Sequence, residues 1–562
     1  MTWHGKGASP IALVSQPARV SDIAPYHDQL LFGLVALAVL RLWILPLSSS
    51  LWLDETVTYW SAYKGIGAAI TRSQFFQGQQ VVYSLIAALA MRVGGASEIA
   101  LRLPSVIAAA LTAWLLFLLG KELFDREAGI FAVLVYTSFP VVAKEAAANA
   151  RPYAIGMLLV VAAMLQLVRW MRSGRLRNMA AFVVLSAAVP YLHYLFAVMY
   201  LVFFLYCAYV RWSREAPVSR QRLGIAAILI LLLILPLLWN ALHAKRINAE
   251  ASFAQTPETI QLFSSLLNPI LGVSLLFGLL VGVLVFGGCR ATLAGLSRST
   301  WLLLVGGLTI PVFVLYLVAR LTPFETFVPR YFLTAVPALA LLIGWIVRSM
   351  EPARARIIVG TAIVLVSIIS FGKIPVNQLA SLQGEDWRSA AALVRVAGIS
   401  QNTPVLIRVG LIESAKIRWD INIDHDSPLL SPISKYPVPG RVVLVPYGFD
   451  PEAVKYLEDV YSQVLMPVDT FVLIARNGAM VPWLRGWCLG HGFTALKMGN
   501  PEGITVLLFR RQRPGAVPEI SLHSACRLCA KPAGSKTSTR QARKFGVSEI
   551  PAGKPRSPET QS

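Results

Sequence analysis

Residues 30–55 read LLFGLVALAVLRLWILPLSSSLWLDE, an apolar run that ends in two adjacent carboxylates, Asp54 and Glu55. An α-helix needs about 20 apolar residues to cross a hydrocarbon core of about 30 Å. The run has that length, and the only charge before Asp54 is Arg41. The stretch therefore predicts a membrane-spanning helix that is followed at once by an acidic loop.

Similar apolar runs recur as far as Phe371. Hydrophobic residues make up 56% of the chain and charged residues 14%, and the mean hydropathy is +0.61. Soluble domains carry nearer a quarter charged residues. We expect a polytopic α-helical membrane protein with about eleven spans, at 29–47, 100–120, 129–143, 152–171, 179–192, 193–210, 224–243, 269–288, 301–319, 331–347 and 356–372.

The net charge of +22 does not indicate a nucleic-acid partner, because the basic residues lie in short loops and in the tail. Residues 510–562 alone hold eleven Lys and Arg against three Asp and Glu. The five cysteines form no disulfide framework, and the CxxC of Cys526 and Cys529 lacks the second ligand pair that a zinc site needs. We predict no metal site and no cofactor, and the metal requirement stays open.

Basic loops indicate the orientation, because cytoplasmic loops are enriched in Lys and Arg. Four basic segments, 169–177, 211–222, 290–298 and 348–356, should all be cytoplasmic. Residues 179–210 must then form a hairpin of two short helices with its tip at 190–194, and residues 81–93 should lie flat at the interface. The outer face receives 48–99, 144–151, 244–268, 320–330 and everything after 373.

The chain should divide into four parts. We expect a cytoplasmic segment at 1–28, a transmembrane domain at 29–372 whose first outer loop is 48–99, an extracytoplasmic α/β domain at 373–512, and a disordered basic tail at 513–562. In the third part, helical periodicity covers 386–396, an amphipathic stretch covers 481–489, and β-type runs occur at 405–409, 442–445, 471–475 and 504–509.

Several polar residues meet the membrane surface on the same predicted side. Asp54 and Glu55 follow the first span, and such carboxylates are costly there unless they are used or paired. Helix capping by the acidic pair is the plainer alternative. Arg151-Pro152-Tyr153, His193-Tyr194 and Arg330-Tyr331 add cations and aromatic rings, for which interfacial snorkelling is the alternative.

This combination suits a reaction of a lipid-phosphate-linked sugar. Such a donor keeps its tail in the bilayer and presents its phosphate at the outer interface. Cations would hold the phosphate as the leaving group, while a carboxylate takes the proton of the acceptor hydroxyl.

At these residues the chain resembles the GT-C superfamily of membrane glycosyltransferases, specifically bacterial enzymes similar to protein O-mannosyltransferases and to lipid A aminoarabinose and galacturonic acid transferases. The resemblance covers most of 30–512. It rests on the order of Arg41, Trp52-Leu53-Asp54-Glu55 with Tyr59, Gly95-Ala96-Ser97-Glu98, Leu101-Arg102-Leu103-Pro104-Ser105, residues 119–124, Ala150-Arg151-Pro152-Tyr153-Ala154, Pro329-Arg330-Tyr331-Phe332 with Pro337, and Glu385-Asp386-Trp387-Arg388.

The resemblance implies inverting transfer of a monosaccharide from a polyprenyl-phosphate donor on the non-cytoplasmic face. It implies that Asp54 is the general base and that Glu55 positions Asp54 or contacts the acceptor. The residues expected to bind the donor phosphate or the substrate are Arg151, Tyr153, Arg330, Tyr331, Tyr59, Tyr83 and His193.

Two positions depart from the family pattern. A His-Pro-Pro-Leu-Tyr-like run of many members is represented here by residues 79–83, of which only Tyr83 agrees, and Asn149 stands where a Glu often precedes the Arg-Pro-Tyr motif. Glu145, one helical turn earlier, is a possible replacement. Both departures concern the identity of the sugar and the acceptor.

The partners follow from this interpretation: membrane lipid, the polyprenyl-phosphate sugar, and a glycolipid, polysaccharide or protein acceptor. The expected location is a bacterial inner membrane with the active site facing the periplasm or exterior. A lipid or sugar carrier without catalysis and a non-catalytic envelope scaffold of the same fold are the alternatives. A carrier should line the membrane midplane with polar residues, whereas here they gather at one face.

Overall fold

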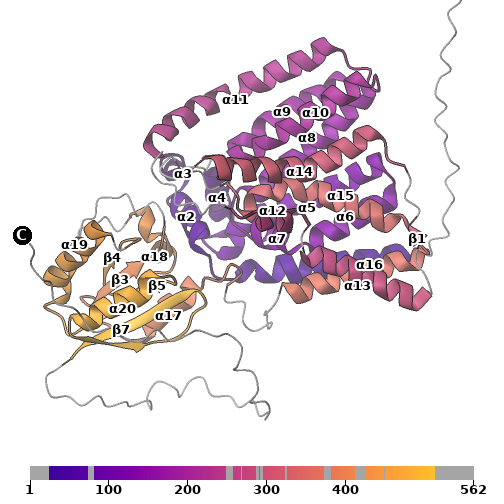
Figure 1. Cartoon of the computed structure of the whole chain (residues 1–562). Coiled ribbons are helices and arrows are strands. Elements are labelled where there is room, and N and C mark those ends of the chain that lie inside the picture. The colour runs from indigo at the N-terminus through magenta and orange to yellow at the C-terminus, as the bar shows by residue number, and fades with distance from the viewer. Residues whose placement is uncertain are drawn as a thin grey trace, which may run out of the picture. The chain divides into compact units, whose positions relative to one another are not determined.

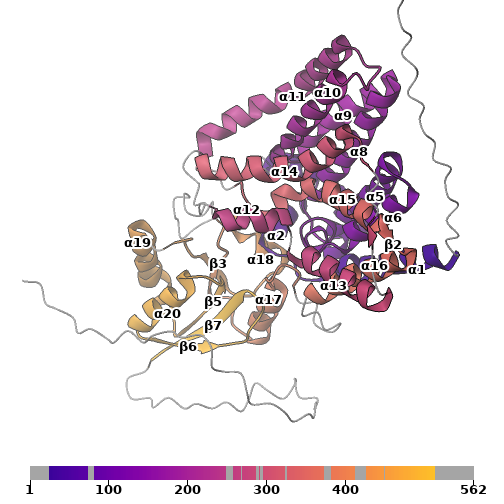
Figure 2. The same ribbon diagram turned by 45° about the vertical axis from the view of Figure 1, so that its right-hand side comes forward.

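The computed structural model of the 562-residue chain describes residues 25–73, 81–248, 257–267, 269–286, 290–291, 295–322, 326–371, 381–411, 426–448 and 450–512. The predicted disordered tail at 513–562, with its CxxC, lies outside these ranges, as does most of the predicted segment 1–28. Helices dominate the described residues up to Phe371 (Figures 1 and 2).

Eight helices among the described residues are long and apolar enough to cross a membrane, and a bent pair brings the number to nine. The expected spans at 179–192 and 269–288 coincide with α9 (Leu176–Leu192) and α13 (Pro269–Phe286), which are not among these nine. The polytopic helical class is confirmed. The eight spans are Asp28–Ser48, Glu98–Leu123 (α5), Tyr153–Ser173 (α8), Tyr194–Trp212 (η4 and α10), Arg220–Leu237 (within α11, Arg220–Asn248), Arg298–Leu321 (α14), Pro329–Arg348 (η5 and α15) and Ala353–Ser370 (α16).

The bent pair replaces the straight span expected at 129–143. Helix α6 (Arg126–Ser138) ends before Pro140, and the next helical segment, Pro140–Ala147, leaves at 58°. Proline has no N–H to continue the hydrogen-bond ladder and excludes the helical conformation of the residue before it, so the helix breaks there. The second segment ends in a π-helical turn, η3 (Ala143–Ala147), which leads directly to Asn149 and Arg151.

The first span is also irregular where it approaches the outer loop. Helix α1 (Pro25–Ala38) passes into a π-helix, η1 (Val39–Ile44), and then into a 3-10 turn, η2 (Leu45–Ser48). Arg41 lies in the π-helical segment. The first outer loop then forms α2 (Leu53–Ala62), α3 (Ile66–Ser73) and α4 (Val81–Gly94), the last a short apolar helix of the kind expected at the interface.

Small residues allow the central spans to approach closely. A Cβ atom on Gly344 of α15 would lie 2.6 Å from the carbonyl oxygen of Ala128 and 2.7 Å from the amide nitrogen of Ala132, both on α6. Such contact is possible only without a side chain, as is common where membrane helices pack. One buried apolar cluster joins these helices to α5 and α8.

The described residues between 381 and 511 contain a five-stranded sheet of order β4-β3-β5-β7-β6. Strands β3 (Pro404–Arg408), β4 (Arg441–Leu444) and β5 (Thr470–Arg476) are parallel, while β7 (Ile504–Arg511) and β6 (Phe493–Lys497) are antiparallel additions. The four predicted strands and the helices α17 (Trp387–Val396) and α20 (Met480–Gly490) are confirmed. Strand β6 and the helices α18 (Ser431–Lys435) and α19 (Pro451–Val460) were not predicted.

The two faces of the sheet pack against different partners, since successive strand residues point to opposite sides. Leu406 and Leu473 face α19 and α20, which lie beside the strands in Figure 1. Val405 and Ile407 belong to a cluster that also contains Val57 of α2. The α/β part thus shares a hydrophobic core with the first outer loop, and the boundary predicted between the two domains stays a prediction.

Candidate active site

The acidic pair of the first outer loop begins helix α2. Glu55 is the third residue of this helix and accepts a hydrogen bond from the backbone N–H of Trp52 at 3.3 Å. Glu385 fixes the same end of the helix, because its carboxylate accepts the backbone N–H of Leu53 at 3.0 Å. The α/β part therefore helps to position the first turn of the helix that carries Asp54.

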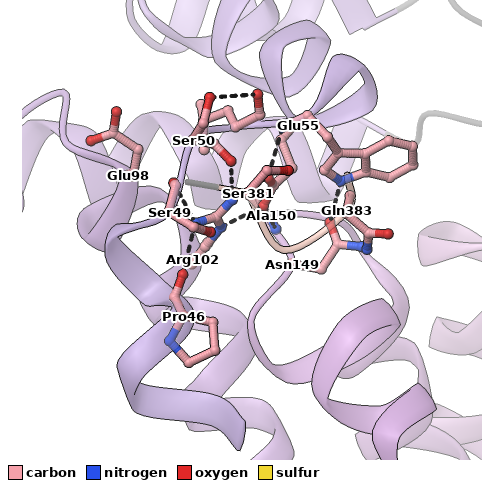
Figure 3. Close-up of polar contacts among 12 residues, drawn as sticks. Pro46, Ser49, Ser50, Glu55, Glu98, Arg102, Asn149, Ala150, Ser381 and Gln383 are labelled. Carbon is pink, nitrogen blue, oxygen red and sulfur yellow. Dashed lines mark hydrogen bonds and ion pairs between the residues drawn. The ribbon is translucent and has the colours of Figure 1, made fainter. Parts of the chain in front are cut away.

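Glu55 is fully buried, and its carboxylate accepts hydrogen bonds from three residues, Trp52, Arg102 and Ala150. Arg102 of α5 approaches with two nitrogens, of which Nε lies 2.7 Å from Oε1 and Nη2 pairs with Oε2. The backbone N–H of Ala150 donates to Oε1 at 2.7 Å. Figure 3 shows this network. A buried carboxylate with such a set of donors holds segments together and has little capacity left for substrate.

The sequence predicts no role for Arg102, which lies in the motif Leu101-Arg102-Leu103-Pro104-Ser105. It is fully buried, and its Nη1 donates to the carbonyl oxygens of Leu47 and Ser49 at 3.0 and 2.8 Å. The available signal was an arginine near the outer end of a long apolar helix, because a charge there needs a partner. The sequence could not identify Glu55 as that partner.

Asp54 has the opposite environment, although it directly precedes Glu55 in the chain. Its side chain is 24% exposed, and its Oδ2 lies 3.9 Å from nitrogens of both Arg151 and Arg330. These distances are too long for hydrogen bonds, so the two cations flank the carboxylate without occupying it. Arg151 precedes α8 and Arg330 is the second residue of η5 (Pro329–Ala335), and the tertiary structure brings both to the start of α2.

Aromatic rings form one wall beside these arginines. The ring centroid of His193 lies 5.4 Å from that of Tyr153 and 5.1 Å from that of Tyr331. Arg330 lies over the rings of Trp52 and Tyr331, at 5.8 and 5.3 Å, an arrangement that holds a guanidinium group in place. Burial, followed by the charges of Arg151 and Arg330, lowers the pKa of His193 to about 3. His193 is therefore a neutral hydrogen-bonding group at neutral pH.

Several buried polar atoms around Asp54 have no hydrogen-bond partner among the described residues. They are Nε of Arg151, Nε of Arg330, Nδ1 of His193, Oε2 of Glu145 and Nδ2 of Asn149. Buried polar groups are nearly always hydrogen-bonded, and an unpaired one costs about 1–3 kcal/mol. Their concentration at one place indicates a site that a polar ligand completes.

Two of the predicted site residues lie farther from this group. Tyr59 stacks on Tyr63 at 5.4 Å and lies beneath Lys435 at 5.1 Å, in the contact between α2 and α18. Tyr83 is buried, and its hydroxyl lies 3.1 Å from that of Ser105. Ser105 in turn donates weakly to the carbonyl of Arg151 at 3.4 Å, so Tyr83 supports the site from behind.

The positions that depart from the family pattern also lie here. The Oδ1 atom of Asn149 accepts the indole N–H of Trp52 at 3.3 Å, and both residues are buried. Glu145 interacts favourably with Arg330 and unfavourably with Asp54 and Glu55. Within the described ranges, no group of three or more His, Cys, Asp or Glu side chains is arranged to hold a metal ion.

Residues 79–239 match the family model described as dolichyl-phosphate-mannose-protein mannosyltransferase. No curated protein sequence matches the chain. The fold is similar to the crystal structure of ArnT from Cupriavidus metallidurans in the apo state, with a TM-score of 0.55 at 10% identity, over 86% of this chain and 98% of that one.

The same ArnT bound to undecaprenyl phosphate gives a TM-score of 0.52 at 10% identity, with 86% of this chain and 98% of that one covered. A looser likeness, with a TM-score of 0.42 at 12% identity, covers 80% of this chain and 69% of the archaeal oligosaccharyltransferase AglB from Archaeoglobus fulgidus in complex with an inhibitory peptide and a dolichol-phosphate. The chain thus contains a segment that matches a mannosyltransferase family model, and its fold is similar to that of ArnT.

Proposed function

We propose that this protein transfers a monosaccharide from a polyprenyl-phosphate donor to an acceptor hydroxyl, with inversion, and that Asp54 is the general base. The observation that carries the proposal is the set of unpartnered, buried donors on Arg151, Arg330 and His193 beside a carboxylate that accepts no hydrogen bond from them. A phosphate supplies the acceptor oxygens that these donors lack.

In the proposed step, the acceptor oxygen attacks the anomeric carbon as its proton passes to Asp54. The bond between that carbon and the phosphate oxygen breaks, and the electron pair leaves with the phosphate. Arg151 and Arg330 stabilise the charge that develops on the phosphate, since donors aimed at developing charge lower the barrier. The carboxylate of Asp54, flanked by both cations, lies close to where that phosphate would be held.

Glu55 has a positioning role in this proposal. Its carboxylate binds Arg102 and the backbone N–H of Ala150, and thereby joins the first loop to the segment that carries Arg151. We also propose that the site faces the non-cytoplasmic side of a bacterial inner membrane. The basic loops at 169–177, 211–222, 290–298 and 348–356 support this orientation, because such loops are typically cytoplasmic.

The test is turnover of purified protein with a panel of polyprenyl-phosphate sugars. Asp54→Asn keeps the shape of the side chain and removes the base, so kcat should fall about 10²–10⁴-fold. Binding of the polyprenyl phosphate should persist, because the arginines remain. Asp28→Asn is the matched control, since Asp28 also pairs with an arginine, Arg126, and is 29% exposed.

Near-normal turnover by Asp54→Asn would refute its role as the base. If the wild-type protein consumes none of the donors but still moves them across a bilayer, the carrier alternative is correct instead. If it neither consumes nor moves them, the scaffold alternative is favoured.

A further inference from the structure

A second polar cavity lies in the α/β part, at the edge where the parallel strands end. Arg408 and Arg476 are the last residues of β3 and β5, and Tyr447 follows β4. Together with the start of α20 they line a cavity of about 330 Å³. The carboxyl ends of adjacent parallel strands are where open α/β sheets most often bind ligands.

Arg408 is held in place, and one of its three guanidinium nitrogens has no hydrogen-bond partner among the described residues. The residue is 8% exposed, and its Nη1 and Nη2 donate to the carbonyl oxygens of Arg476 and Tyr447 at 3.1 and 2.8 Å. Its Nε is buried and has no hydrogen-bond partner in the described part of the chain. An unpaired buried charge is costly, so a fixed guanidinium group that lines a cavity indicates a missing anion.

The start of helix α20 contributes a second attraction for an anion. The helix is 11 residues long, and its N-cap residue, Ala479, makes no side-chain hydrogen bond to the first turn. A Cβ atom on Gly478 would lie 3.9 Å from Nη1 of Arg408, so the helix start and the guanidinium group are neighbours. Free backbone N–H groups and the helix dipole both favour an anion at this end.

We propose that this cavity binds an oxyanion of the phosphate class. Its volume exceeds that of a bare phosphate, so a phosphate carried on a larger group also fits. Arg476 links the cavity to the active site, because its Nε pairs with Glu385 at 2.7 Å and Glu385 accepts the N–H of Leu53. Arg476 would therefore contact both the anion in the cavity and Glu385, the residue that fixes the start of α2.

The experiment is calorimetric titration of the full chain, in phosphatidylcholine nanodiscs, with inorganic phosphate. All proteins carry Arg330→Gln, which weakens phosphate binding at the proposed donor site, so that a failure here is separate from a failure of the proposed function. Arg408→Gln and Arg476→Gln should each weaken binding about tenfold or more, because each removes a charged donor. Arg441→Gln is the matched control, since Arg441 begins the neighbouring strand β4 at the opposite end and is exposed.

Saturable binding that the two substitutions weaken and the control does not would support the site. A second titration, with phosphatidylglycerol in the nanodiscs, distinguishes the source of the anion: competition indicates a lipid headgroup, and no competition indicates a soluble phosphate. Absence of binding in the Arg330→Gln background, or equal binding by Arg408→Gln and Arg441→Gln, would overturn the proposal. Thermal unfolding checks that each variant is folded. If Arg408→Gln does not fold, Arg476→Gln alone is compared with the control.

Discussion

Glu55→Gln should lower stability much more than it affects the chemical step. The substitution keeps the shape of the side chain but removes the negative charge beside Arg102, and both side chains are at most 1% exposed. Arg102 would remain as a buried charge without a counterion. Breaking a buried ion pair on one side typically costs about 3–5 kcal/mol. The interactions with the N–H groups of Trp52 and Ala150 are weakened as well.

The measurement is thermal unfolding of the purified protein, followed by intrinsic tryptophan fluorescence. In larger domains, each kcal/mol lost from the free energy of unfolding lowers the unfolding midpoint by about 2–4 °C. We therefore expect the midpoint of Glu55→Gln to fall by roughly 6 °C or more. Glu122→Gln is the matched control. Glu122 also pairs with an arginine, Arg169, at 2.5 Å, but the two side chains are 26% and 35% exposed. Glu122→Gln should therefore lower the free energy of unfolding by less than about 1 kcal/mol.

A double-mutant cycle of Glu55→Gln with Arg102→Met tests this ion pair directly. The two substitutions together should cost less than the sum of the single ones, because the double variant leaves neither charge unpaired. A Glu55→Gln protein that unfolds at the wild-type temperature but has lost all turnover would refute the reasoning. In that case Glu55, and not Asp54, would be the group that acts on the substrate.

Three further predictions follow from the same contacts. Arg330→Gln should weaken binding of polyprenyl phosphate about tenfold or more, and unchanged binding would remove Arg330 from the donor site. Reporters fused after residues 174 and 216 should be cytoplasmic and those after 255 and 400 external, and an external signal at 216 would reverse the proposed orientation. Partial burial raises the pKa of Asp426, but hydrogen bonds from Lys64 and Tyr63 and the charge of Arg72 outweigh it and hold the pKa below the ordinary 3.8. Its contribution to stability should thus be complete above about pH 4 and be lost as the pH falls below that. Asp426→Asn should reduce this acid sensitivity in unfolding measurements, and an unchanged acid profile would contradict the role of this cluster.

Local sequence was sufficient for the class of the protein and for most of its helices and strands. Apolar length predicts helices at all eleven expected positions because a membrane span must satisfy its own backbone and face lipid. The alternation of apolar and polar residues, together with β-branched residues, is also a local signal, and it predicts four of the five strands of the sheet. Strand β6 (Phe493–Lys497) was missed because its burial is irregular, with only Phe493 buried.

The different environments of Asp54 and Glu55 were decided only by the tertiary structure. Successive helix residues point about 100° apart, so one carboxylate faces Arg102 and the other faces Arg151 and Arg330. These partners lie 47, 97 and 276 positions away from Glu55 or Asp54 in the sequence. No local pattern carries that information.

The sequence by itself determined that acidic, basic and aromatic residues gather at one face of a helical membrane protein, since hydropathy and loop charge act along the chain. The tertiary structure decided which of them meet. The break before Pro140 directs Asn149 and Arg151 toward α2, and the packing of α18 on α2 places Lys435 over the ring of Tyr59. Side-chain charges interact only over short distances in space, and packing, not sequence separation, sets those distances.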